Sequence, residues 1–132
     1  MTEEMKQMIE EYVKLNIPIL VSLNKEMFKN YTLIDAECSD EFLKGKFDID
    51  GYKTPTWYNE IKTKENDPVN LLIIDNFDKI NKDKQKRFIE LLKYRKVNSL
   101  EIPKNCCIIV LARQINKESI NEEVYSLLAH IS

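Results

Sequence analysis

The amino-acid sequence predicts an α/β fold, a three-layer sandwich whose middle layer is a sheet of about four mostly parallel strands. The strand candidates are continuous apolar runs and not alternating ones, which is typical of strands buried on both faces. Segments with helical spacing of apolar residues lie between these runs, as in parallel α/β folds. A chain of 132 residues can bury one core, so we expect residues 1–132 to form a single domain.

The expected elements can be placed along the chain from these patterns. Strands are expected at residues 17–23, 31–36, 69–74 and 106–112. Helices are expected at residues 5–13 and from Thr56 through Ile61. A third helix is expected to start at Asn81 and to carry Phe88, Leu91 and Leu92 on its apolar face. A fourth is expected to start at Ser119 and to carry Val124, Leu127, Leu128 and Ile131. Residues 24–30 leave room for about two helical turns. Residues 37–67 are mixed and polar, and we expect them to be largely irregular outside the helix from Thr56.

The composition argues against several function classes. The charge is nearly balanced, with 20 Lys and Arg against 22 Asp and Glu, so bulk attraction to nucleic acid or to an anionic membrane is not expected. The two glycines, Gly45 and Gly51, are too few and too far apart for a phosphate-binding loop. No apolar run is long enough to span a bilayer and no signal-peptide pattern is visible, so we expect no membrane contact and a cytoplasmic location.

The cysteines and acidic residues do not form a recognisable metal motif. Cys38, Cys106 and Cys107 are odd in number and lack zinc-site spacing, so we expect them to be buried small hydrophobic residues in strands. Asp48 and Asp50 resemble the opening of a calcium loop, but the remaining ligands are absent. We therefore expect neither a metal nor another cofactor.

Asp75 ends the aliphatic run of residues 71–74 and is the first candidate site residue. Ligands of open α/β folds bind at the carboxyl edge of the sheet, and a carboxylate there can hold Mg²⁺ through water. The alternative is that Asp75 only ends the strand or caps the next turn. Taken alone, the pattern favours this structural role.

A longer pattern runs through residues 71–112. The aliphatic run ending in Asp75-Asn76 precedes a helix with Gln85 and the pair Leu91-Leu92, and these are followed by Arg95-x-Val97, Pro103-x-Asn105 and another aliphatic run. This order resembles the central part of AAA+ P-loop ATPases, especially their MoxR-like branch. Residues 40–51, with Leu43-Lys44-Gly45, are similar to that family's acidic segment containing Leu-x-Gly. The resemblance implies that the strand at 71–74 lies between those at 31–36 and 106–112.

The departures from the family fall at its catalytic positions. Where the Gly-Lys-Ser/Thr (Walker A) loop belongs, the sequence has Asn24-Lys25-Glu26-Met27, with Lys25 as the sole candidate for the phosphate lysine. Asn76 stands in place of the catalytic Glu, and an amide cannot act as a general base. Arg113 and Gln114 do not match the usual polar sensor residue. His130 stands where the arginine finger belongs, and a mostly neutral imidazole substitutes poorly for a guanidinium.

We therefore expect a truncated AAA+-like domain that is not an enzyme. Asp75 and Asn76 would be vestiges of the magnesium-binding and catalytic pair (Walker B), and His130 would be a vestige of the finger or a plain surface histidine on a frayed turn. We also expect the chain to lack the family's fifth strand and helical lid.

The expected function is protein binding, as an accessory or regulatory subunit of, for example, an intact ATPase. The candidate partner surface comprises Tyr52, Trp57, Tyr58, Lys84, Arg87 and Lys96. The aromatic residues could equally cover the sheet, and the basic helix at 82–96 could be a solvated outer face. Two other functions stay open, a divergent nucleotide-binding protein and a polyanion- or nucleic-acid-binding module that uses residues 82–96.

Overall fold

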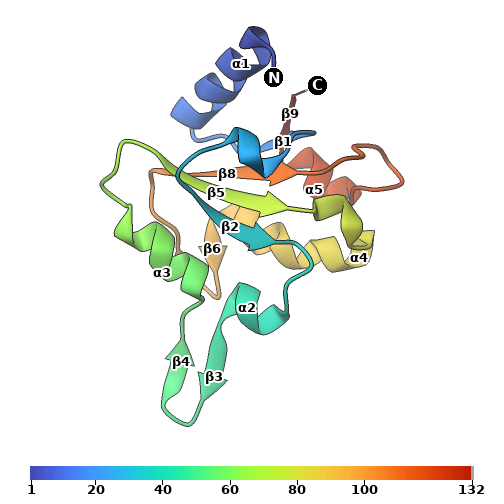
Figure 1. Ribbon diagram of the computed structural model, residues 1–132. Coiled ribbons are helices and arrows are strands. Elements are labelled where there is room, and N and C mark those ends of the chain that lie inside the picture. The colour runs from blue at the N-terminus through green and yellow to red at the C-terminus, as the bar shows by residue number, and fades with distance from the viewer. Residues whose placement is uncertain (132) are drawn as a thin grey trace.

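Five parallel strands form one sheet in the computed structural model, which describes residues 1–131 (Figure 1). They are β1 (Ile19–Val21), β2 (Tyr31–Asp35), β5 (Asn70–Asp75), β8 (Cys106–Leu111) and β9 (Ala129–Ile131). Their spatial order is β2-β5-β8-β1-β9, and every neighbouring pair is parallel. The four apolar runs are thus strands as predicted, and the expected position of β5 between β2 and β8 is confirmed.

The C-terminal segment differs from the prediction, because it contains a fifth strand. The helix α5 (Glu122–Ser126) is short and is capped by Asn121, not by Ser119. The chain then turns, and β9 pairs with β1, with the Ala129 N–H donating to the Pro18 carbonyl at 2.9 Å. The apolar spacing that predicted a helix through Ile131 fits a short helix followed by a strand equally well.

The helices are shorter and more varied than predicted. The structure contains α1 (Glu3–Lys14), α2 (Asp40–Lys44), α3 (Thr56–Thr63) and α4 (Lys82–Gln85). The expected long helix after Asn81 continues from α4 as a 3₁₀ turn (Lys86–Phe88) and a π-helical turn (Glu90–Tyr94). Residues 24–30 hold only a 3₁₀ turn, η1 (Lys25–Met27), and another, η2 (Phe77–Lys79), follows β5.

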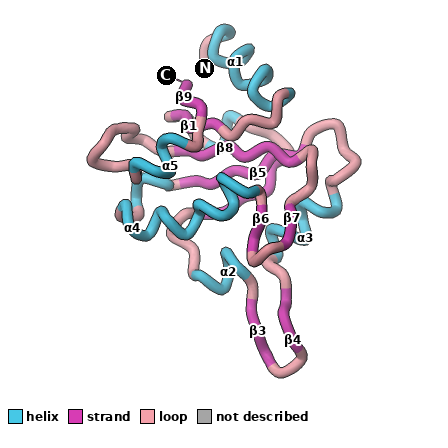
Figure 2. Tube along the Cα trace, turned by 180° about the vertical axis from the view of Figure 1, so that it is seen from behind, coloured by secondary structure: helices cyan, strands magenta, loops and turns pink. Residues whose placement is uncertain are grey.

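Two antiparallel hairpins complete the fold. One pairs β3 (Lys46–Asp48) with β4 (Gly51–Lys53), and the other pairs β6 (Lys96–Val97) with β7 (Leu100–Glu101). The first hairpin projects away from the sheet below α2, as Figure 2 shows from behind. The segment at 37–67 is therefore more ordered than expected.

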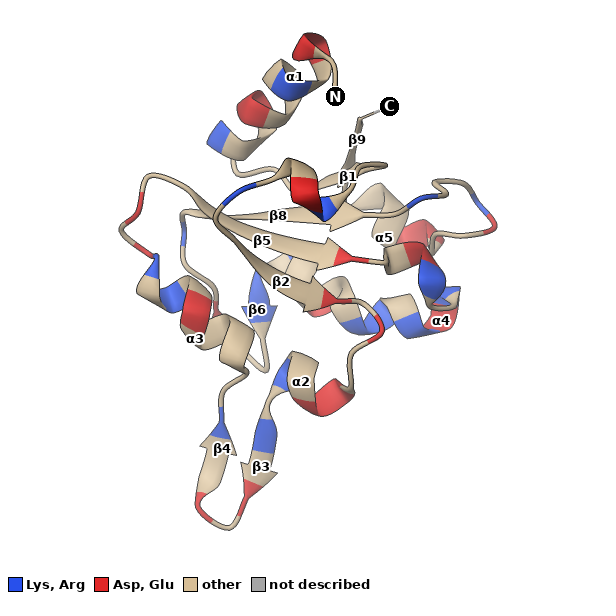
Figure 3. Ribbon diagram, in the orientation of Figure 1, with Lys and Arg blue, Asp and Glu red and all other residues tan. Residues whose placement is uncertain are grey.

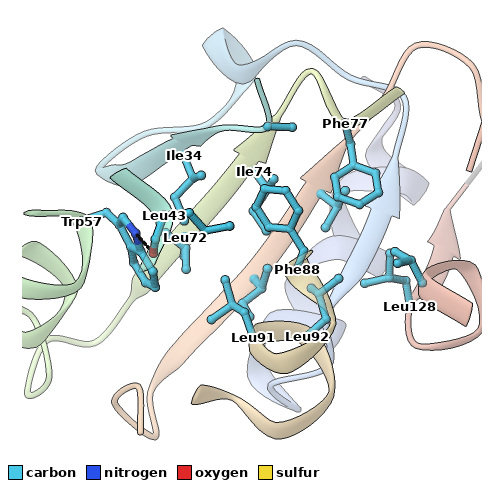
Figure 4. Close-up of a cluster of buried hydrophobic side chains, with 14 of the residues drawn as sticks. Ile34, Leu43, Trp57, Leu72, Ile74, Phe77, Phe88, Leu91, Leu92 and Leu128 are labelled. Atoms are coloured by element: carbon cyan, nitrogen blue, oxygen red, sulfur yellow. Dashed lines mark hydrogen bonds between the residues drawn. The ribbon is translucent and has the colours of Figure 1, made fainter. Parts of the chain in front are cut away.

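The two faces of the sheet are covered unequally. The larger core cluster lies between one face and the segments α2, α3, 82–94 and α5; it includes Ile34, Leu43, Leu72, Ile74, Phe77, Phe88, Leu91, Leu92 and Leu128 (Figure 4). The smaller cluster joins the other face to α1 and includes Ile9, Ile73, Ile109 and Ile131. Helices on both faces make the expected three-layer sandwich, with α1 as the thinner outer layer. Within residues 1–131, none of the helices combines the length and the apolar character that a membrane crossing requires.

Candidate functional site

The carboxyl ends of β2 and β5 bring two aspartates side by side. Asp35 and Asp75 are the last residues of these strands and are partners in the parallel register. Parallel strands end at the same edge of a sheet, and this edge is where ligands of open α/β folds bind. The predicted site residue Asp75 therefore lies where a functional site is expected.

Asp75 is held by contacts within the protein. One carboxylate oxygen, Oδ1, accepts the backbone N–H of Asn76 at 2.9 Å. The other, Oδ2, lies 3.8 Å from the ammonium of Lys25, which begins the 3₁₀ turn after β1. The Asp75 side chain is only 19% exposed, whereas that of Lys25 is 36% exposed.

Asn76 links the ends of the two strands. Its backbone is left-handed, with φ 59°, a conformation that asparagine tolerates better than most residues. Its side-chain amide donates to Asp35 Oδ2 at 3.2 Å, while Asp35 Oδ1 accepts the Glu37 N–H. The amide thus has a structural role as a hydrogen-bond donor at the position where the resemblance places a catalytic glutamate.

A small cavity adjoins these residues. Its volume is about 220 Å³, below the 300–1,000 Å³ that is usual for small-molecule sites. It is lined by Leu23, Asn24, Lys25, Glu26, Asp75, Asn76, Asp78, Leu111, Ala112 and Arg113. Both signs of charge are present, and one acid, Asp78, already accepts the Gln114 N–H at 2.9 Å.

The loop after β1 does not form a phosphate cradle. Two of its N–H groups, those of Met27 and Phe28, donate to the carbonyls of Asn24 and Lys25 within the 3₁₀ turn. A phosphate-binding loop instead points several free N–H groups at the ligand. The turn therefore satisfies its own backbone and leaves Lys25 as the group that faces Asp75.

No metal-ligand cluster is present in the described part of the chain. Residues 1–131 contain no group of three or more His, Cys, Asp or Glu side chains that could hold a metal ion.

Burial raises the pKa of Cys106 to about 12 and that of Cys107 to about 11. Neither thiol is ionised near neutral pH, so neither is a ready nucleophile or metal ligand.

The aromatic part of the candidate partner surface is mostly buried. Trp57 and Tyr58 lie on α3 with 1% and 9% exposure, and they belong to the larger core cluster. Tyr52, on β4, is half-buried and donates its hydroxyl to the Lys44 carbonyl at 2.6 Å. The prediction that Trp57 and Tyr58 belong to a partner surface is wrong, because α3 turns both side chains toward the sheet.

The basic segment 82–96 is divided between internal and external roles. Arg87 is 9% exposed and binds both the Ala36 carbonyl and the Asp40 carboxylate, the latter at 3.0 Å. Arg95 donates to the carbonyl oxygens of Pro103 and Cys106, at 2.9 and 2.7 Å. Lys84 is exposed and Lys96 half-buried. Arg87 is therefore a structural residue and not part of an open basic face.

His130 lies on an edge strand and not on a frayed helical turn. Its ring lies 3.8 Å from that of Tyr125, and its Nε2 is 2.9 Å from the Tyr125 carbonyl oxygen. It does not line the cavity beside Asp75. The structure thus brings Asp75 and Asn76 together and leaves His130 apart from them.

Two exposed residues that the sequence analysis did not single out are Phe47 and Ile49. They lie on the β3–β4 hairpin with 75% and 99% exposure. The alternation of apolar and charged residues before Gly51 was a signal for a hairpin, but it was obscured by the polar character of residues 37–67.

The comparisons with known proteins bear on the fold alone. No family model matches the chain, and no curated protein matches it in sequence. A solved structure of NtrX from Brucella abortus is similar, with a TM-score of 0.61 and 15% sequence identity over 96% of this chain. The match spans 34% of that protein, so this chain corresponds to about a third of its length. The likeness supports the α/β sandwich with a parallel sheet.

Replacing Asp75 by Ala is expected to lower the melting temperature. The change removes the acceptor of the Asn76 N–H and leaves Lys25 unpaired, and the loss of such a partly buried acceptor costs about 1–3 kcal/mol. Millimolar Mg²⁺ should hardly shift the wild-type melt, because Lys25 already faces the carboxylate. A Mg²⁺-dependent stabilisation of the wild type that disappears in Asp75→Ala would contradict this prediction.

Proposed function

We propose that this chain is a catalytically inactive AAA+-like domain that acts by binding a partner protein, as an accessory or regulatory subunit of, for example, an intact ATPase. The observation that carries the proposal is the 3.8 Å pair between Lys25 and Asp75. In a working P-loop ATPase the phosphates and Mg²⁺ lie between the lysine after the first strand and the acid that ends the central strand. Here the lysine pairs with the acid itself, so bound phosphate and Mg²⁺ would have to displace this contact.

The connection from β1 to β2 supports the same proposal. In the parent family a helix follows the phosphate loop and presents its N-terminus to the nucleotide. Here the chain makes one 3₁₀ turn and enters β2 at Tyr31. The connection therefore lacks both the glycines of a phosphate-binding loop and a helix N-terminus that would attract the phosphates.

The strand order is compatible with the kinship that the proposal assumes. β5 lies between β2 and β8, which is the arrangement that the resemblance implies. In the flavodoxin-like order the first strand lies between the second and the third, whereas here β1 lies between β8 and β9. The sequence predicted that the chain lacks the fifth strand of the AAA+ pattern. The sheet has a fifth strand, β9, so this difference from the family does not apply.

Nucleotide binding is the second candidate function, and one observation favours it. Two cationic side chains, Lys25 and Arg113, line the cavity at the carboxyl edge. A phosphate could recruit both cations if the pair between Lys25 and Asp75 opened. The small volume and the three acids in the lining favour the inactive alternative.

Titration of ATP–Mg²⁺ into the full chain is expected to give no binding tighter than about 10 μM, which corresponds to roughly -7 kcal/mol. The physical reason is the missing cradle together with the pair between Lys25 and Asp75. Calorimetry measures the binding, and phosphate release measures turnover. Tighter binding that Lys25→Ala and Arg113→Ala both weaken would establish the nucleotide-binding alternative instead.

A further inference from the structure

The β3–β4 hairpin presents apolar side chains to solvent at its tip. Ile49 is 99% exposed in the turn, and Phe47 is 75% exposed on β3. Figures 1 and 2 show from opposite sides that the hairpin extends beyond α2, away from the five-stranded sheet. Neither side chain belongs to the core clusters. Phe47 faces its cross-strand partner Tyr52, so Ile49 is the residue whose apolar character is not explained by packing within residues 1–131.

The base of the hairpin is fixed to the body of the protein. The Lys44 carbonyl accepts hydrogen bonds from the Tyr52 hydroxyl and from the Asn98 side chain, at 2.6 and 2.7 Å. Gly45 has a φ of 90°, and a Cβ added there would lie 2.5 Å from the Lys53 carbonyl oxygen. This close approach and the positive φ require glycine at the junction between α2 and β3.

The tip is ordered by its own contacts. The Asp50 N–H donates to the Asp48 carboxylate at 2.9 Å, which closes the turn around Ile49. The Phe47 ring packs on the Tyr52 ring, with their centroids 4.8 Å apart. Because the tip is already organised, a partner would lose little conformational freedom in binding it.

The charges around the apolar tip define the chemistry of a partner. Figure 3 shows acidic residues at the turn and basic residues nearer the body. Asp48 is paired with Lys53 at 3.0 Å, whereas Asp50 has no ion-pair partner among residues 1–131. The unpaired carboxylate of Asp50 beside Ile49 favours a partner surface that carries Lys or Arg.

We propose that the β3–β4 hairpin inserts Ile49 and Phe47 into an apolar pocket of the partner protein, a pocket rimmed by Lys or Arg side chains that receive Asp50. This inference rests on the proposed protein-binding function and assigns it to a surface. Interface energy is concentrated in a few anchors at the centre of a contact, and a rigid hairpin tip can supply such anchors.

The first step of the test identifies the protein that contacts the tip of the β3–β4 hairpin. A photo-crosslinking amino acid is placed at position 49 of the full chain, and in a control at position 69. Val69 is a matched control because it is an apolar residue with 51% exposure beyond the far end of α3. The crosslinked protein from a lysate of the source cells is identified by mass spectrometry and purified. We expect a single protein crosslinked at position 49 and not at position 69.

The purified protein is then titrated with the full chain and its variants. We expect Ile49→Ser and Asp50→Lys each to weaken binding about tenfold. Val69→Ser and Asp67→Lys should bind as the wild type does, and all four variants should keep the wild-type melting temperature. The affinity should also fall with added salt, and more steeply for the wild type than for Asp50→Lys.

Three results would overturn the inference. One is a partner whose affinity is unchanged by Ile49→Ser, which would leave the proposed function standing and place the interface elsewhere. Another is crosslinking at position 49 to a second copy of this chain, with a concentration-dependent dimer in sedimentation that Ile49→Ser abolishes. The third is no crosslink at position 49 above that at position 69. Failure of the proposed function itself would appear separately, as ATP binding in the calorimetric titration.

Discussion

Replacing Gln85 by Leu is expected to lower the free energy of unfolding by about 3–5 kcal/mol. The Gln85 side chain is completely buried at the end of α4. Its Nε2 donates to the carbonyl oxygens of Phe77, Ile80 and Ser119, and its Oε1 accepts the Asn121 N–H at 2.6 Å. Leucine has a similar volume but leaves buried backbone groups of two loops without this partner.

Chemical denaturation of the full chain measures this loss. Lys84→Leu is the matched control, because Lys84 is exposed on the same helix, and a surface change of this kind should stay within about 0.5 kcal/mol. Gln85→Glu should be intermediate at best, since a carboxylate can accept from Asn121 but cannot donate to the three carbonyl oxygens. Equal stabilities of Gln85→Leu and Lys84→Leu would show that the amide does not join these segments.

The sequence predicted the four apolar strands of the sheet because burial on both faces leaves a pattern that needs no tertiary information, whereas β9 and the two hairpins were not predicted. Residues 71–74 and 106–112 are apolar throughout, and both runs became central strands. The same reasoning does not distinguish one long helix from consecutive turns of different pitch. The turn at Glu90–Tyr94 is π-helical and ends at Arg95 in the left-handed conformation, which apolar spacing does not reveal.

The candidate site was predicted in part. Asp75 was expected at the carboxyl edge because it follows a buried strand, and it lies there. The position of Lys25 opposite Asp75 depends on how a loop without glycine folds back over the sheet edge, and no residue pattern specifies that path. Gln85 was recognised only as part of a family resemblance, since its partners are backbone atoms of loops distant in sequence.

Trp57 shows why exposure is difficult to predict in a polar segment. Tryptophan is frequent both in cores and at interfaces, and the residues around position 57 have no clear period. The helix α3 begins after Pro55 and turns Trp57, Tyr58 and Ile61 toward β2 and β5. The helix start at Thr56 was predicted correctly, and for Trp57 the structure supports the alternative that the aromatic residues cover the sheet.

Replacing Trp57 by Ala is expected to destabilise the chain by about 3–5 kcal/mol. The indole is 1% exposed and packs with Ile34, Leu43 and Leu72, and its Nε1 donates to the Leu43 carbonyl at 3.0 Å (Figure 4). Alanine would leave a cavity between α3 and the sheet and an unpaired carbonyl at the end of α2. Trp57→Phe should cost less, about 1–3 kcal/mol, because it keeps much of the volume and loses mainly the hydrogen bond.

The matched control for Trp57→Ala is Tyr94→Ala, because Tyr94 is an aromatic residue with 60% exposure. Urea unfolding should show a small change for Tyr94→Ala and a large one for Trp57→Ala. The Leu43 carbonyl lies three residues before Lys46, where β3 begins, so loss of the indole should also loosen the base of the hairpin. Hydrogen exchange of the Lys46 and Lys53 amides should therefore accelerate in Trp57→Ala and not in Tyr94→Ala. If both variants unfolded at the same urea concentration, Trp57 would be a surface residue and the packing between α3 and the sheet described here would be wrong.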